Sequence, residues 1–366
     1  MKKDSAVELA RILGCLIVIG AHVRPNPWVE GAVDPSRAFL CCVVADGVAV
    51  FWIIMGFFLF NNSSYKKLWM KTTKNIIVPL VMFSLFWLYF YGWIVEGKSL
   101  IESIAYQNEE YWSMLKEILK WRNPISGTSH LWYLYTYLMI ILIYPVLKAF
   151  VDYLDVDEIR VRCFLLISFS FIILNDLSGN NMAAFSHVSI NALFPAAVEV
   201  IWGHIIYKRR EKFCKKRYMF LSIGLFCFLN LIRWFIQKER YKLTPPNIEI
   251  LYWFTSIGLL CAICIIVFSF SVLNCNKKVP IINSIICYLG SFTFSIYLIH
   301  PMIRDILQKY DIISKVKSVI WSQVSGFFGE VLYTGCMAII VFCVSLMAVI
   351  AIRQMRILVS RVLREG

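Results

Sequence analysis

The sequence predicts an all-α fold, a polytopic membrane bundle of about ten transmembrane helices with both chain termini in the cytoplasm. Of the 366 residues, 59% are hydrophobic and 16% are charged, whereas a soluble domain carries about 25% charged residues. The hydrophobic residues occur in repeated runs of roughly 18–24 residues, the length that crosses the hydrocarbon of a bilayer. No stretch between these runs is long enough for a soluble fold, so residues 1–366 are expected to form a single membrane domain.

The predicted spans follow the apolar runs. In chain order they are 6–23, 38–60, 75–95, 130–150, 163–174, 188–207, 218–235, 250–273, 281–306 and 330–352. Lys and Arg orient the bundle, because they collect in cytoplasmic connections. The densest basic cluster, 208–217, and the basic tail, 353–364, fall on the same side only if an even number of spans separates them. Both are therefore placed in the cytoplasm.

The longest connection, 96–129, is then external. Within it Tyr111, Trp112, Leu115 and Trp121 recur at roughly helical spacing. This pattern predicts an amphipathic helix at the outer surface, which either anchors in the interface or caps a site.

The net charge of +14 follows from this topology. Basic residues between apolar spans are what membrane orientation requires, so no nucleic-acid partner is expected. The partner implied by the composition is the lipid bilayer.

Arg11 and His22 are polar residues within the first span. At about 100° per residue, their separation returns the side chains to within about 20° of the same face. They lie roughly 16 Å apart along the helix axis. One face of this helix thus carries a cation near the cytoplasm and an imidazole near the outside. The alternative is that Arg11 snorkels to the inner surface and His22 is an interfacial residue.

Glu199 lies near the middle of the sixth span, at a depth similar to that of Arg11. Because an unpaired charge at that depth is costly, Glu199 is predicted to pair with Arg11. Glu8, one turn before Arg11, is the alternative partner. Arg233 and Arg304 lie near the outer ends of their spans, where snorkelling accounts for them.

Histidines gather at the outer ends of several predicted spans. They are His22, His130, His187 and His300, and Asp46 also lies in the outer half of its span. Two or three such histidines with a carboxylate could form a general-base site, although a lone histidine there is usually solvated. A zinc site is a further alternative, but no HExxH or comparable spacing supports it.

Lys71 and Lys74 stand one helical turn apart just before the third span. At this spacing two ammonium groups share one face at the cytoplasmic boundary. They are either a topology signal or a clamp for a phosphorylated cytoplasmic ligand.

Five short motifs occur in the order found in the acyltransferase 3 family of membrane acyltransferases, which the chain resembles over nearly its whole length. They are Arg11-x10-His22, Asp46-Gly47-Val48 with Met55-Gly56-Phe57, Lys71-x-x-Lys74 with Pro79, His130-Leu131-Trp132-Tyr133-Leu134, and Tyr297-Leu298-Ile299-His300.

The resemblance implies transfer of an acyl group, usually acetyl, from cytoplasmic acyl-CoA to a hydroxyl of an extracytoplasmic glycan or glycolipid. Acetyl-CoA would be a co-substrate, with no permanently bound cofactor or metal, in a bacterial cytoplasmic membrane. His22 would take the catalytic role with Arg11 as its partner, and Lys71 and Lys74 would bind the donor. The expected acceptor-binding or supporting residues are Asp46, His130, Glu199 and His300.

The sequence departs from the family pattern in two motifs. Lysines replace both arginines of R-x-x-R and lack the bidentate fork of a guanidinium, and Met55 stands at a usual serine position. No hydrolase-like domain is expected after the last span. Alternatives to the enzyme are a polysaccharide or small-molecule transporter and a sensor or structural subunit. The oligomeric state, a homodimer included, stays open.

Overall fold

The computed structural model describes residues 4–29, 32–62, 64–99, 101–102, 128–177, 193–241, 255–273 and 280–365, and these residues are almost entirely helical. Among them the only strands are β1 (Trp28–Val29) and β2 (Ala32–Val33), an antiparallel pair in which Trp28 is opposite Val33. The predicted all-α class is confirmed. The amphipathic helix predicted around Tyr111–Trp121 lies outside the described residues.

Within the described ranges, five helical segments are long and apolar enough to cross a membrane. They are α1 (Ser5–Val23), α2 (Pro35–Val43) together with α3 (Gly47–Leu59), α12 (Lys216–Tyr241), α13 (Ser256–Leu273) and α17 (Gly326–Glu365). Two bent helix pairs raise the number to seven if each pair is one span. These pairs are α8 (Trp132–Leu142) with α9 (Tyr144–Asp155), bent by 68°, and α14 (Pro280–Gly290) with α15 (Thr293–Lys309), bent by 55°.

The other three predicted spans are also helical. They correspond to α5 (Val78–Ile94), α10 (Glu158–Leu177) and α11 (Leu193–Lys208). The helices α5 and α11 contain 17 and 16 residues, fewer than the roughly 20 that span hydrocarbon unaided. The described helices therefore support five to seven spans, and the count of about ten and the orientation stay predictions. The remaining helices in the described part of the chain are α4 (Tyr65–Thr72), a π-helical turn (Thr73–Ile77), α16 (Ile312–Gln323) and 3₁₀ turns at Ser129–Leu131 and Arg210–Phe213.

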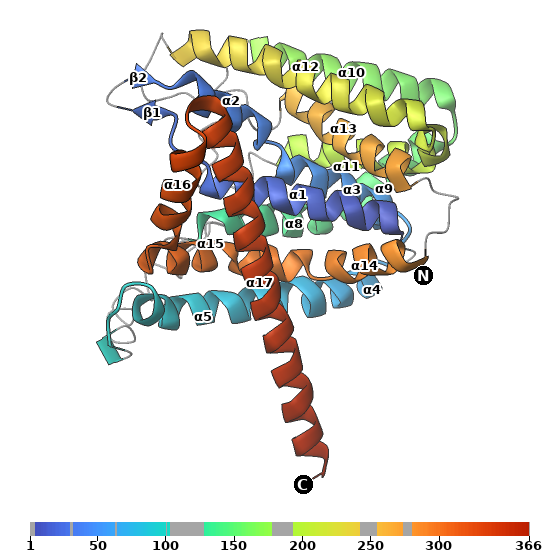
Figure 1. Cartoon of the computed structure of the whole chain (residues 1–366). Coiled ribbons are helices and arrows are strands. Elements are labelled where there is room, and N and C mark those ends of the chain that lie inside the picture. Colours follow the sequence, from blue (N-terminus) through green and yellow to red (C-terminus); the bar gives the residue numbers. More distant parts are fainter. Residues whose placement is uncertain are drawn as a thin grey trace.

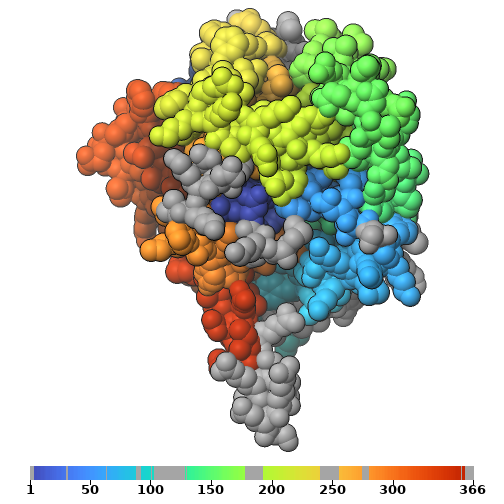
Figure 2. All heavy atoms as spheres, turned by 90° about the vertical axis from the view of Figure 1, so that its right-hand side faces the viewer, coloured from blue at the N-terminus to red at the C-terminus, as the bar shows by residue number. Residues whose placement is uncertain are grey.

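Helix α1 occupies the middle of the bundle (Figure 1). It packs against α3, α13, α14, α15 and α17. Its buried side chains include small residues such as Ala6, Ala10 and Gly14, which let neighbouring backbones approach closely. Figure 2 looks onto the bundle from the side where α1 begins, and its first turns surface between α14 and the segment around α4. The helix that carries Arg11 and His22 is thus held on several sides.

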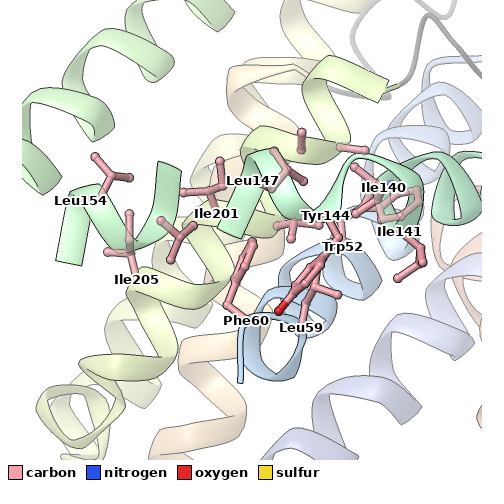
Figure 3. Packing of buried hydrophobic residues seen from close by; sticks show 14 of the residues in the cluster. Trp52, Leu59, Phe60, Ile140, Ile141, Tyr144, Leu147, Leu154, Ile201 and Ile205 are labelled. Carbon is pink, nitrogen blue, oxygen red and sulfur yellow. The ribbon is translucent and has the colours of Figure 1, made fainter. Parts of the chain in front are cut away.

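Helices α3 and α11 approach each other closely at two glycines. A Cβ atom on Gly56 would lie 1.8 Å from the carbonyl oxygen of Val200, and one on Gly203 would lie 2.0 Å from that of Ile53. Both positions therefore require glycine. Large apolar side chains from α3, α8, α9 and α11 fill the space beside this contact, as Figure 3 shows for Trp52 and Tyr144.

The second predicted span, 38–60, is not continuous. Helix α2 ends at Val43 and α3 begins at Gly47, with Asp46 at the N-cap position of α3. The Asp46 side chain makes no capping hydrogen bond. Irregular backbone at membrane depth is tolerated only where protein buries it, and Asp46 is 4% exposed.

Candidate functional site

Three of the predicted histidines come together from three different elements. His22 lies in the last turn of α1, His130 in the 3₁₀ turn before α8, and His300 in α15. The ring centroids of His22 and His300 are 5.1 Å apart, those of His130 and His300 5.5 Å, and those of His22 and His130 6.3 Å. His300 is fully buried, whereas His22 is partly exposed. We call these residues the histidine trio.

Pro301 explains how His300 is oriented. Proline has no backbone N–H, so within α15 it leaves the carbonyl oxygen of Tyr297, four residues earlier, without its helical donor. The Nδ1 atom of His300 lies 2.8 Å from this oxygen and donates to it. In the neutral ring, Nε2 of His300 is then a free acceptor, and this buried atom has no hydrogen-bond partner among the described residues.

Helix α15 also fixes His130. Nε2 of His130 donates to the carbonyl oxygen of Leu298 at 3.3 Å, and the hydroxyl of Tyr297 donates to the carbonyl oxygen of His130. In a neutral ring this leaves Nδ1 of His130 unprotonated. The trio can thus present imidazole nitrogens able to accept a proton.

Arg304 lies beside the trio. Its guanidinium donates to Asp305 at 2.7 Å and to the backbone carbonyl oxygen of His22 at 3.4 Å. The side chain is 30% exposed. Snorkelling alone therefore does not describe Arg304, because it also ties α15 to the end of α1.

The predicted ion pair between Arg11 and Glu199 is not formed. Arg11 pairs instead with Glu8, the alternative partner, with 2.8 Å between the guanidinium Nη1 and the carboxylate Oε1. Glu8 lies one turn away on the same helix, so this pairing needs no reach across the bundle. The guanidinium also lies over the ring of Phe58, 5.9 Å from its centroid. Glu199 is 2% exposed, and its Oε2 lacks a hydrogen-bond partner within the described ranges.

Arg11 lines a cavity of about 310 Å³. Its wall comes from α1, α3, α8 and the stretch from α4 to the π-helical turn. It includes the polar residues Arg11, Asn62, Lys71, Thr72, Asn75, Tyr133 and Tyr137 and the apolar residues Phe51, Met55, Phe58 and Leu59. We call this space the cation-lined cavity.

The two lysines of the Lys71-x-x-Lys74 motif are placed differently. Both lysines are exposed, but Lys71 lines the cation-lined cavity and Lys74 is not among the lining residues. The predicted shared face assumes α-helical geometry across both residues. Lys74 instead lies in the π-helical turn, which is wider than an α-helix and rotates it relative to Lys71.

Asp46 is engaged elsewhere. Its two carboxylate oxygens accept from both terminal nitrogens of Arg233 at 2.8 and 3.1 Å. Arg233 also donates to the carbonyl oxygen of Cys42 at 2.9 Å and is 0% exposed. The prediction that Arg233 snorkels is therefore wrong, because its charge is neutralised inside the protein. Both residues were placed in the outer halves of their spans, and opposite charges at similar depth were the signal for this pair.

Metal binding finds no support within the described parts of the chain. No group of three or more His, Cys, Asp or Glu residues there has the geometry of a metal site. The zinc alternative for the histidines therefore has no ligand set in the described structure.

Comparison with known proteins gives one match. The model of the Acyl_transf_3 family, described as an acyltransferase domain, matches residues 4–350. No curated protein and no solved structure matches the chain.

Proposed function

Because the chain belongs to the acyltransferase 3 family, a family of membrane acyltransferases, we propose that it moves an acetyl or other short acyl group from acyl-CoA to a glycan. The donor would bind from the cytoplasm, and the acceptor hydroxyl would belong to a glycan or glycolipid on the other side. One observation carries this proposal. Helix α1 carries both groups to which the proposal assigns a role, Arg11 at the cation-lined cavity and His22 in the histidine trio.

The cation-lined cavity suits the donor. Acyl-CoA carries phosphates at one end and a thioester at the tip of a narrow arm. Arg11 and Lys71 offer positive charge to phosphate groups, and a guanidinium bound to one carboxylate oxygen keeps further N–H donors. Asn62 and Asn75 add neutral hydrogen-bonding groups to the same wall.

His22 is the proposed general base. It removes the proton of the acceptor hydroxyl, and the oxygen attacks the thioester carbonyl carbon to form the new ester bond. The carbon–sulfur bond breaks, and the proton passes from His22 to the departing thiolate. The products are the acylated glycan and free CoA, and His22 returns to its neutral form.

His130 and His300 are proposed to support this step. Each has one ring nitrogen committed to a backbone carbonyl oxygen of α15. The remaining nitrogens are available to orient the acceptor hydroxyl or His22. Their fixed rings reduce the reorganisation that proton transfer requires.

The test is His22→Ala in purified protein reconstituted in lipid, with radiolabelled acetyl-CoA and soluble bacterial polysaccharides as acceptors. We expect acyl transfer to fall by about 10²–10⁴-fold while membrane insertion stays normal. His204→Ala is the matched control, because His204 lies outside the trio and contacts Asp155 instead. Full activity of His22→Ala would rule out the base role. Uptake of polysaccharide into vesicles without labelled product would favour the transporter.

A further inference from the structure

Three aromatic side chains meet between the cation-lined cavity and the histidine trio. They are Phe51 of α3, Tyr133 of α8 and Tyr297 of α15. The ring centroids are 6.1 Å apart for Phe51 and Tyr133, 6.4 Å for Phe51 and Tyr297, and 5.8 Å for Tyr133 and Tyr297. Each ring therefore contacts the other two, and we call them the aromatic layer.

One side of the aromatic layer faces the cation-lined cavity, and the other side faces the histidine trio. Phe51 and Tyr133 line the cation-lined cavity. Tyr297 faces the other way, with its ring centroid 5.7 Å from that of His130 and 6.0 Å from that of His300. The described residues that line the cavity include neither Tyr297 nor any member of the trio. The cavity thus ends at the layer, and the histidines lie behind it.

The two sides of the layer are held differently. Tyr297 is 4% exposed, and it is fixed by its hydroxyl bond to His130 and by the His300 bond to its carbonyl oxygen. Phe51 is only partly buried and has no polar group to anchor it. Tyr133 is supported by the ring of Trp52, at a centroid distance of 4.2 Å. Phe51 is therefore the member that can move into the cavity at least cost.

We infer that the aromatic layer is the gate that the acyl group passes to reach His22, and that its size restricts the donor to short acyl chains. This inference rests on the proposed function. In acyl-CoA the acyl group is the leading tip of the arm, so it meets the layer before the thioester does. Each extra methylene must then be accommodated among three packed rings and the histidines behind them.

The test measures acyl-chain preference. Wild-type protein and Phe51→Ala are assayed with acetyl-, butyryl- and hexanoyl-CoA and soluble bacterial polysaccharides as acceptors, by following the release of free CoA. We expect the ratio of kcat/KM for hexanoyl-CoA to that for acetyl-CoA to rise about tenfold or more in Phe51→Ala, because a pocket discriminates added methylenes by such factors. Phe51→Leu should give a smaller rise.

Phe169→Ala is the matched control. Phe169 is also a partly buried phenylalanine on a helix, but it contacts Trp202 and does not line the cavity. Its chain-length ratio should equal that of the wild type. A ratio within about twofold of wild type in both Phe51 variants would overturn the gate, and Phe51→Leu decides if the alanine variant does not fold. Absence of CoA release from every thioester by the wild type would refute the proposed function instead.

Discussion

Replacing Asp46 by leucine should destabilise the protein more than replacing Arg233 by methionine, although both changes break the same ion pair. The pair is bidentate, and the guanidinium is completely buried. Removing one partner of a buried pair typically costs about 3–5 kcal/mol, because the other charge is left without compensation. A guanidinium keeps its charge under all ordinary conditions, whereas a carboxylate can bind a proton and become neutral. Asp46→Leu therefore belongs at the upper end of this range and Arg233→Met at or below the lower end.

The buried ion pair also predicts how the unfolding free energy of the double variant changes. In Asp46→Leu the carbonyl oxygen of Cys42, at 2.9 Å, is the one hydrogen-bond partner that the guanidinium keeps within the described residues. Replacing both members together removes both charges from the interior, and such replacements range from neutral to about 1–4 kcal/mol stabilising. The double variant should therefore be more stable than either single variant.

The assay is reversible unfolding in mixed micelles with increasing dodecyl sulfate, followed by tryptophan fluorescence. Arg209→Met serves as control, because Arg209 pairs with Glu158 at a partly exposed site, where a pair contributes about 0–1 kcal/mol. If the destabilisation of the double variant equals the sum of the two single values, the residues do not interact. That result would refute the buried ion pair.

Each of two further predictions compares two residues of the same type that lie in different surroundings. Lys71→Ala should raise the KM for acyl-CoA by about tenfold, because one charge-assisted contact is lost. Lys74→Ala should change this KM little. Equal effects of the two variants in steady-state kinetics would contradict the placement of Lys71, but not Lys74, in the cavity wall. Gly203→Ala should destabilise the protein by at least about 3 kcal/mol, because its Cβ would meet the backbone of Ile53 and overpacking alone costs about 1–3 kcal/mol. Gly224→Ala should not, because nothing lies within 4 Å of its Cβ position; similar unfolding free energies for the two glycine variants would count against the α3–α11 contact.

The helical class could be predicted from the sequence, but some of the breaks between consecutive helices could not be predicted. Apolar content locates a span without showing whether its backbone is continuous. The bend between α8 and α9 falls at Ile143, just before Pro145, and a proline there is a recognisable signal for a helix boundary. Pro301, in contrast, lies inside α15 without ending it. At Pro301 the His300 side chain donates to the carbonyl oxygen that the proline leaves without a helical donor.

Some features of the candidate site could likewise be predicted from the sequence, and others could not. The spacing of Arg11 and His22 was readable, because both residues lie on one helix whose periodicity is known. The pairing of Asp46 with Arg233 and the exclusion of Lys74 from the cavity depend on how different helices meet and on a local π turn. No pattern along a single segment reports those contacts.

Helix α17 has a consequence for how the protein responds to its bilayer. Its apolar stretch, Gly326–Met355, has 30 residues and is therefore about 45 Å long, whereas hydrocarbon is about 30 Å thick. A helix of that length keeps its apolar residues in hydrocarbon by tilting, by kinking or by thickening the bilayer around it, and Figure 1 shows α17 crossing the other helices obliquely. Because α17 packs against both α1 and α15, membrane thickness is linked mechanically to the two helices that carry His22 and His300.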